Sequence, residues 1–241
     1  MRLDKAAALA GLMRSEARKA IAAGRVLVNG QPARDPGMQV SPGDVRVDGL
    51  EAPVSSQLHL MVNKPAGVLT ATEDRRLPTV LDLLPEALRR RRPGPVGRLD
   101  RDVTGLVLLT TDGQLAHRLI SPRWKAEKCY RAVCEGRLDE KCVRAFAEGI
   151  ALSDFTARGA VLTILEAGDE RSTADAVLSE GKFHQVKRMF AAVGHPLIAL
   201  ERRRIGTLPL DEALAPGEYR PLTAAEAADL YALCGLEPPE A

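Results

Sequence analysis

The residues best suited to chemistry in this 241-residue chain lie in a short segment around residue 100. Asp100 and Asp102 stand just before the apolar run 105–109, which is rich in β-formers and bounded by Gly105 and by Thr-Asp-Gly. This pattern predicts a buried strand. A carboxylate beside a buried strand is unfavourable unless a partner offsets its charge. Asp100 is therefore either the cap of a turn or a reactive group, and a carboxylate can act as a covalent nucleophile.

Strands and helices alternate after this segment. Residues 128–134 alternate as a strand, and residues 139–148 form a helix that Gly149 stops. A glycine turn at Gly181 leads into an amphipathic helix that ends at Gly194. Further strands are predicted at 160–165, 174–178 and 197–204, and residues 58–64 begin as an alternating strand that turns at Asn63-Lys64-Pro65-Ala66-Gly67.

The first 48 residues have a pattern of their own. Helical periodicity over residues 3–22 is interrupted near Ser15, which predicts an N-cap there and a second helix over residues 16–23 that Gly24 stops. Residues 25–32 predict two strands around an Asn29-Gly30 turn, and Pro42-Gly43-Asp44 predicts a turn before residues 45–48. Basic residues gather around the second helix, where Arg18 and Lys19 share a face. Such a face is either solvated or suited to phosphate contacts.

Two further segments bear on organisation. Residues 49–57 are small, polar and proline-containing, which is typical of a connection between domains. Residues 89–92 are four consecutive arginines just before the segment around Asp100. Such a run is usually solvated and mobile, and here it is equally consistent with a loop that faces phosphates at the rim of a cleft.

Composition limits the function classes. Apolar residues make up 45% and charged residues 27%, as in ordinary globular proteins, whereas aromatic residues make up only 3%, which argues against recognition by repeated base stacking. The net charge of +2 says little about partners. Four cysteines without a Cys-x-x-Cys pair predict neither a metal site nor disulfides. The absence of a signal-peptide pattern and of apolar runs of about 18–20 residues predicts a soluble, cytoplasmic protein with no membrane partner.

The segment 97–113, Gly-Arg-Leu-Asp-x-x-x-Thr-Gly-Leu-x-Leu-Leu-Thr-x-Asp-Gly, resembles the signature of pseudouridine synthases of the RsuA and RluB/E/F family. Residues 63–67 resemble that family's first motif, residues 180–189 its third motif, and residues 200–206 and 214–222 its final segments. Residues 1 to about 50 resemble an S4 RNA-binding domain. The resemblance implies an α+β fold: a small N-terminal S4 (αL-like) domain with its linker (1–56) and a catalytic domain (57–241) on a mixed, mainly antiparallel sheet with flanking helices.

The same resemblance implies the functional residues. Asp100 would be the nucleophile, Lys187 the cation that pairs with it, and Tyr130 the ring that packs on a flipped uracil and the oxygen that takes part in proton transfer. No cofactor or metal is expected, because the isomerisation involves no redox change. The residues expected to contact RNA are Arg2, Lys5, Arg14, Ser15, Arg18, Lys19, Arg25, Asn29, Arg98, His184, Arg188 and Arg202.

The implied substrate is ribosomal RNA. A lysine at position 187 preceded by His-Gln points to the RsuA branch, which implies 16S rRNA, uridine 516 as the target and a monomeric enzyme. The alternatives are a 23S rRNA synthase of the RluB/E/F type and a non-catalytic RNA-binding assembly factor that uses the S4 module alone. A glycoside hydrolase with Asp100 and Asp102 as its two acids is a third class, which the basic N-terminal module disfavours.

Overall fold

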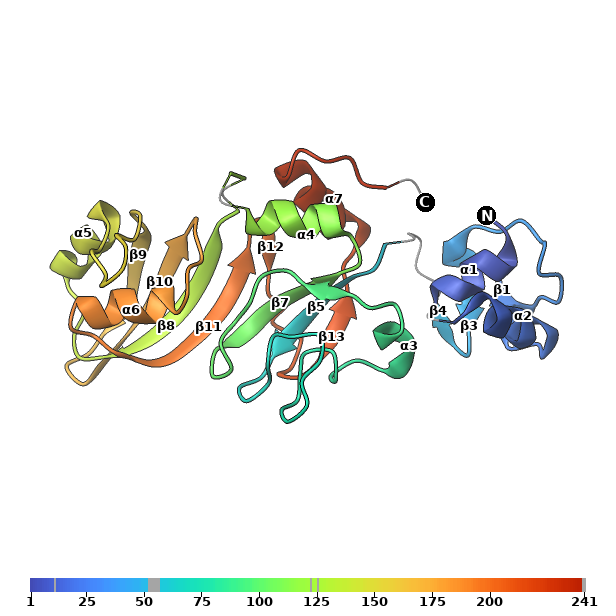
Figure 1. The fold of residues 1–241 in the computed structure, drawn as a ribbon, viewed down its shortest axis with the longest axis horizontal. Coiled ribbons are helices and arrows are strands. Elements are labelled where there is room, and N and C mark those ends of the chain that lie inside the picture. The colour runs from blue at the N-terminus through green and yellow to red at the C-terminus, as the bar shows by residue number, and fades with distance from the viewer. Residues whose placement is uncertain (11, 52–56, 122, 125, 240–241) are drawn as a thin grey trace.

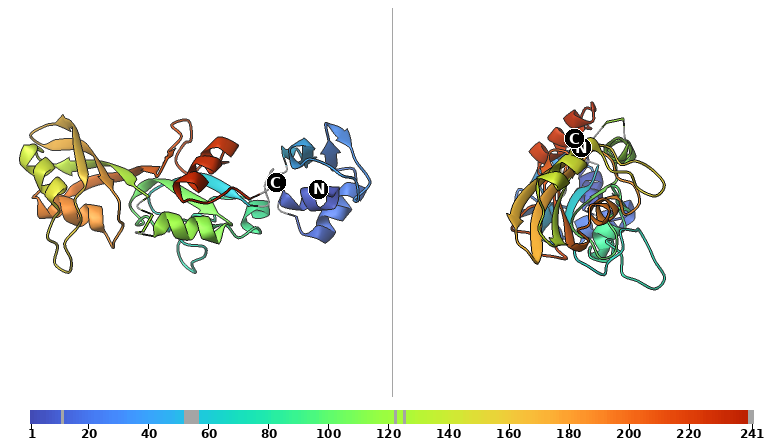
Figure 2. Two further views of the ribbon diagram at one scale, coloured as in Figure 1. Left: turned by 90° about the horizontal axis from the view of Figure 1, so that it is seen from above. Right: turned by 90° about the vertical axis from the view of Figure 1, so that its left-hand side faces the viewer.

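The computed structural model describes residues 1–241 except 11, 52–56, 122, 125 and 240–241 (Figure 1). A small N-terminal domain lies at one end of an elongated molecule, and the larger domain occupies the rest (Figure 2). Among the described residues, no helix is both long and apolar enough to cross a membrane.

The N-terminal domain packs two helices against a four-stranded sheet. The helices are α1 (Leu3–Leu9) and α2 (Arg14–Ala22), and the strand order is β2-β1-β3-β4. The strands are β1 (Val26–Val28), β2 (Gln31–Pro32), β3 (Val45–Val47) and β4 (Leu50–Glu51), with a 3-10 turn at Pro42–Asp44. Their shared core is built mostly from alanine and valine with Leu3 and Ile21, so the helices can approach the sheet closely.

Two expectations for this region are wrong. Helix α2 begins at Arg14 with Met13 as its N-cap, so Ser15 lies in the first turn. The reason is that the Glu16 carboxylate accepts a hydrogen bond from the Met13 amide at 2.8 Å, which caps the helix two residues earlier. The predicted connection at 49–57 also contains strand β4, which pairs with β3; residues 52–56 of that connection lie outside the described residues.

The larger domain is organised around a nine-stranded sheet. Its order is β13-β5-β7-β11-β8-β10-β9, with β6 paired to β7 and β12 paired to β11. Every pairing is antiparallel except β7 with β11, as expected for a mixed, mainly antiparallel sheet. The strands are β5 (His59–Lys64), β6 (Gly94–Pro95), β7 (Thr104–Thr110), β8 (Lys128–Glu135), β9 (Val161–Ala167), β10 (Arg171–Leu178), β11 (Leu197–Ile205), β12 (Leu208–Pro209) and β13 (Tyr219–Pro221).

Five helices flank this sheet. Helices α5 (Glu140–Glu148) and α6 (Gln185–Ala192) lie beside β8–β10, and α4 (Gly113–Ile120) and α7 (Ala224–Leu233) lie over β7 and β5, while the short α3 (Glu86–Arg89) faces the N-terminal domain (Figure 1). Strand β5 is buried at all six positions, so the expected alternation is wrong. Leu60 and Val62 belong to one hydrophobic core and Met61 to another, because the sheet is covered on both sides here.

The parallel contact between β7 and β11 is unusually close. Gly105 pairs with Arg202, has φ +96°, and a Cβ added to it would lie 2.4 Å from the Arg202 carbonyl oxygen. Only glycine tolerates both the positive φ and the close approach of the Arg202 backbone. This residue therefore sets how near β11 comes to the strand that follows Asp100.

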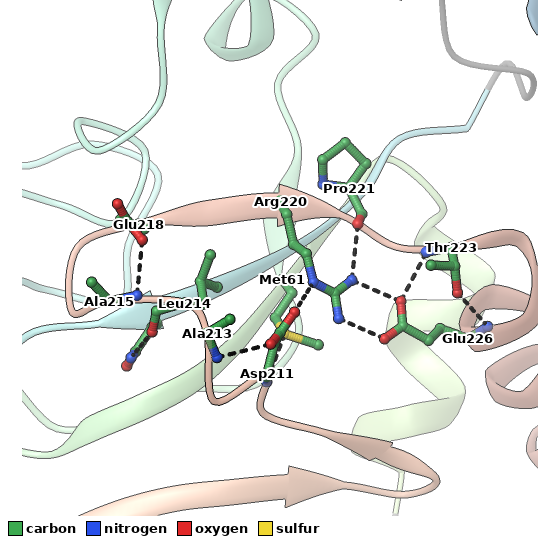
Figure 3. A network of polar contacts seen from close by, with 11 residues as sticks. Met61, Asp211, Ala213, Leu214, Ala215, Glu218, Arg220, Pro221, Thr223 and Glu226 are labelled. Carbon is green, nitrogen blue, oxygen red and sulfur yellow. Dashed lines mark hydrogen bonds and ion pairs between the residues drawn. The ribbon is translucent and has the colours of Figure 1, made fainter.

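A polar network ties the edge strand β13 to α7 (Figure 3). The Arg220 guanidinium contacts Asp211 at 2.6 Å and Glu226 at 2.7 Å, and Glu226 also accepts the Thr223 amide. The hydrogen bond from Arg220 is the main reason that the pKa of Glu226 falls to about 2. The network fastens the C-terminal helix to the sheet.

Candidate active site

Asp100 lies in the loop just before β7 and lines a cavity of about 80 Å³. Its side chain is 29% exposed, whereas that of Asp102 is 74% exposed and Asp102 does not line the cavity. The loop delivers one carboxylate to the cavity and turns the other toward solvent.

Lys187 on α6 contacts both carboxylates. Its Nζ lies 3.1 Å from Asp100 Oδ2 and 2.7 Å from Asp102 Oδ1, so it is within ion-pair reach of Asp100, as predicted. Burial alone would lower the pKa of Lys187, but the hydrogen bonds with Asp102 and Asp100 raise it. The hydrogen bond from Lys187 lowers the pKa of Asp102. The ammonium group of Lys187 therefore stays charged and forms an ion pair with the Asp100 carboxylate.

Tyr130 lies on β8 and lines the same cavity. Its side chain is buried, and the strand pairs it with Ala176 on β10 and Arg202 on β11. The structure thus brings together Asp100, Tyr130 and Lys187 from three separate elements, an arrangement in which a carboxylate, a cation and a phenol can reach one bound group.

His184 is the N-cap of α6 and has a left-handed backbone conformation, φ +49°. Its Nε2 lies 3.4 Å from Asp100 Oδ1, and its ring stacks on Phe183. His184 and Lys187 thus contact different oxygens of the Asp100 carboxylate.

The sequence did not identify Lys64, whose ammonium group holds the loop that carries Asp100. This lysine is fully buried, and its Nζ donates hydrogen bonds to the carbonyls of Pro65 at 2.9 Å, Arg101 at 3.1 Å and Val103 at 2.7 Å. Burial lowers its pKa to about 8, against the opposing effect of Asp102 and Asp100. The signal was present in residues 63–67, but the sequence alone supports only a turn there.

Thr70 holds the same loop on its other side. Its hydroxyl donates to the Leu99 carbonyl at 2.9 Å and accepts from the Leu99 amide at 3.2 Å. With Lys64 holding residues 101 and 103, the backbone on both sides of Asp100 is anchored. An anchored loop limits the motion of the carboxylate.

The expectation that Arg202 contacts RNA is wrong. Arg202 is 3% exposed, its Nε donates to the Leu106 carbonyl at 2.8 Å, and its Nη2 has no hydrogen-bond partner among the described residues. The register of β11 against β8 shifts between Arg202 and Arg204, so the two arginines do not occupy equivalent positions on the strand. Arg202 is thus a packed core residue and not part of the rim.

The arginine run 89–92 is also not at the rim of the cavity. Arg90 contacts Glu16 on α2 at 2.9 Å, and Arg91 donates to the Leu9 carbonyl at the end of α1 at 2.9 Å. None of the four arginines lines the cavity. Arg89, in contrast, contacts Asp82 of the larger domain at 3.6 Å. Two residues of the run, Arg90 and Arg91, therefore help to join the two domains.

The remaining residues expected to contact RNA lie in two places. Arg98 lines the cavity, and Arg188 contacts Asp154 and lies over the Phe155 ring. In the N-terminal domain, three of them surround the fully buried Asp4: Arg2 at 3.2 Å, Arg14 at 3.6 Å and Arg18 at 3.1 Å. The others, which are exposed, are Lys5, Ser15, Lys19, Arg25 and Asn29.

The contacts with Asp4 give these arginines a structural task that the sequence did not reveal. Burial would raise the pKa of Asp4, but hydrogen bonds from Arg2 and Arg18 hold it below its usual value. The guanidinium groups remain about half exposed. One buried carboxylate therefore gathers three arginines on one surface.

Comparison with known proteins agrees with this geometry. Residues 58–192 match the family model described as RNA pseudouridylate synthase, and residues 1–45 match that of the S4 domain. The chain belongs to the RNA pseudouridylate synthases and is a pseudouridine synthase with an N-terminal S4 domain.

Individual relatives extend over nearly the whole chain. It is 43% identical to ribosomal small subunit pseudouridine synthase A of Escherichia coli strain K12, over 95% of this chain and 100% of that one. It is 40% identical to the uncharacterized RNA pseudouridine synthase YtzG of Bacillus subtilis strain 168, over 94% and 96% of the two chains. A solved pseudouridylate synthase structure aligns with a TM-score of 0.68 and 39% identity, covering 95% of this chain and 99% of that one.

Proposed function

We propose that this protein converts a uridine of 16S ribosomal RNA, uridine 516, to pseudouridine with Asp100 as the nucleophile. The observation that carries the proposal is the contact of Lys187 Nζ with Asp100 Oδ2 at 3.1 Å, inside a cavity that Tyr130 also lines. The similarity to small subunit synthases over almost the full chain supports the small-subunit substrate.

The reaction breaks the N1–C1′ bond of uridine and forms a C5–C1′ bond. The Asp100 carboxylate bonds transiently to the nucleoside, the uracil is re-attached through C5, a proton leaves C5, and N1 gains one. No electrons are exchanged with a partner, so the reaction balances within the nucleoside. Lys187 holds a positive charge against the carboxylate, and Tyr130 supplies a flat face for the unstacked base and an oxygen for proton transfer.

Asp102 is a natural control for the role of Asp100. Both carboxylates contact Lys187, but only Asp100 lines the cavity. Asp100→Asn should abolish turnover, whereas Asp102→Asn should retain most of it. A glycosidase needs two acids that face the sugar, whereas only Asp100 lines the cavity. Equal loss in both variants would refute the assignment of Asp100 as the nucleophile.

Lys187 can be tested in the same way. Lys187→Met leaves the Asp100 carboxylate without its cation and should reduce kcat by about 100-fold or more, whereas Lys187→Arg keeps the charge with altered geometry and should lose less. The measurement is single-turnover pseudouridine formation. Equal rates for the two variants would mean that the charge is not required.

The substrate is tested by incubating purified protein with 16S and 23S rRNA transcripts and mapping pseudouridines at nucleotide resolution, with Asp100→Asn as the blank. One new pseudouridine at position 516 of 16S rRNA is expected. Modification of 23S rRNA alone would favour the large-subunit alternative.

The N-terminal domain is proposed to hold the RNA through its basic surface. Lys19 is exposed and is not among the arginines that hold Asp4, so Lys19→Glu changes the charge without removing that cluster. We expect weaker rRNA binding and a salt dependence reduced by about one unit of slope. An unchanged slope would mean that this face is only solvated.

A further inference from the structure

Phe183 stands in the chain between Lys182 and His184, which both line the cavity. Phe183 is 76% exposed, which is the highest value among the exposed large apolar residues in the described part of the chain. Phe146 and Phe190, in contrast, are fully buried. An aromatic ring left in water next to a reaction site gains free energy when a flat partner covers it.

The Phe183 ring is held in place and not merely exposed. It stacks on the His184 ring with centroids 3.8 Å apart and planes 17° from parallel, and His184 in turn reaches Asp100. The left-handed backbone of His184 is uncommon for a residue with a side chain, and His184 itself lines the cavity.

The loop that carries the pair is anchored. The backbone amide of Lys182 donates to Oε1 of the buried Gln185 at 2.9 Å, and the backbone amide of Gln185 donates back to the Lys182 carbonyl at 3.2 Å. The side-chain amide of Gln185 also donates a hydrogen bond to the Glu180 carboxylate. An anchored aromatic loses little conformational entropy when a ligand stacks on it.

Cations line the cavity that adjoins this ring pair. Lys182, which precedes Phe183 in the chain, and Arg98 both lie in the cavity wall together with His184. An exposed ring beside a cavity lined by cations fits a nucleobase with its phosphate, because every base offers a π-face and every nucleotide an anion.

We propose that the Phe183–His184 pair is the stacking platform for a nucleotide next to the target uridine. This inference rests on the proposed function. Lys182 and His184 line the cavity but Phe183, between them, does not, so its ring faces the neighbour of the nucleotide in the cavity. The platform holds the flanking base while the uridine is extruded, and it thereby contributes to the choice of RNA.

The first test compares Phe183→Ala with Phe183→Tyr on a 16S rRNA transcript. Loss of one stacked base should raise KM by about 5-fold or more with kcat nearly unchanged, and the tyrosine variant should restore KM. Val161→Ala removes another exposed apolar side chain, 62% exposed on the edge strand β9 and not part of the cavity wall, and should leave KM unchanged. An unchanged KM for Phe183→Ala would overturn the proposal, as would a loss of kcat alone, which would indicate that Phe183 only supports His184.

A second test does not depend on turnover. The chain has a single tryptophan, Trp124, so the double variant Trp124→Phe, Phe183→Trp places the only indole in the platform. Its fluorescence should be quenched when the same transcript binds. Quenching without pseudouridine formation by the wild-type protein would reject the proposed function and retain the platform; binding without quenching would reject the platform.

Discussion

Lys64→Met is the perturbation that tests most directly how the reactive loop is held. The substitution removes the donor to three carbonyl groups, those of residues 65, 101 and 103. At about 2 kcal/mol for the buried Val103 carbonyl and about 1 kcal/mol for each of the two half-buried carbonyls, the loss is about 4 kcal/mol. The variant no longer buries a charge, and because burial lowers the pKa of Lys64 from 10.5 to about 8, this recovers about 3 kcal/mol. The net destabilisation is therefore about 1 kcal/mol at pH 7.

The pH dependence has a definite sign. Because the folded-state pKa of Lys64 lies near 8 and the unfolded value near 10.5, the unfolded chain binds more protons between these values. The cost of burying the charge is fully present below pH 8 and declines as the pH rises toward 10.5. The wild-type protein should gain stability relative to Lys64→Met across that window.

Urea denaturation of both proteins at pH 7 and pH 9.5 measures this difference, and single-turnover pseudouridine formation at pH 7 measures the effect on Asp100. We expect kcat of the variant to fall by about 10-fold or more, because misplacement of a reacting group by about 1 Å has an effect of this size or larger. Lys141→Met, which removes an exposed lysine on α5, should change neither quantity. A stability difference that does not grow with pH would refute the reasoning that Lys64 is held as a buried charge.

Three other predictions concern residues that do not line the cavity. Asp4→Asn should destabilise the N-terminal domain by about 1–3 kcal/mol above pH 4 and weaken rRNA binding, because three arginines lose their shared partner; thermal melts at pH 7 and pH 3 should show the wild-type advantage shrinking as Asp4 is protonated. Glu226→Gln should lower stability at pH 7 by about 2 kcal/mol, and the difference should vanish as the pH falls from about 4.5 toward 2, because the lowered pKa of Glu226 adds stability only while the group is ionised; a difference that persists at pH 2 would exclude the ion pair as its cause. Gly105→Ala should prevent the close contact of β7 with β11 and reduce soluble yield, since its Cβ would overlap the Arg202 backbone; a wild-type melting temperature would contradict this.

Local patterns were sufficient for much of the fold. The apolar run before Thr-Asp-Gly predicted β7, the Asn29-Gly30 pair predicted the β1–β2 turn, and Gly149 predicted the end of α5. These signals depend on residues within a few positions of each other, where periodicity and turn chemistry act. The same holds for Asp100, whose neighbours in sequence were enough to single it out as a candidate.

Local patterns could not predict contacts between residues that are far apart in the sequence. The burial of β5 on both faces depends on α4, α7 and the loops before β7, and the burial of Arg202 depends on a register shift against β8. Neither is encoded by the strand's own alternation of residues.

The sequence by itself determined the class of chemistry, the small basic N-terminal module and the residues Asp100, Tyr130 and Lys187 as candidates. Only the tertiary structure decided that Lys64 anchors the reactive loop, that Asp4 gathers three arginines, and that Phe183 stands exposed on His184. The physical reason is that the burial of a charge and the exposure of a ring depend on neighbours that are far away in the sequence. Lys64 and Val103, which are 39 positions apart in the chain, meet only when the sheet has formed.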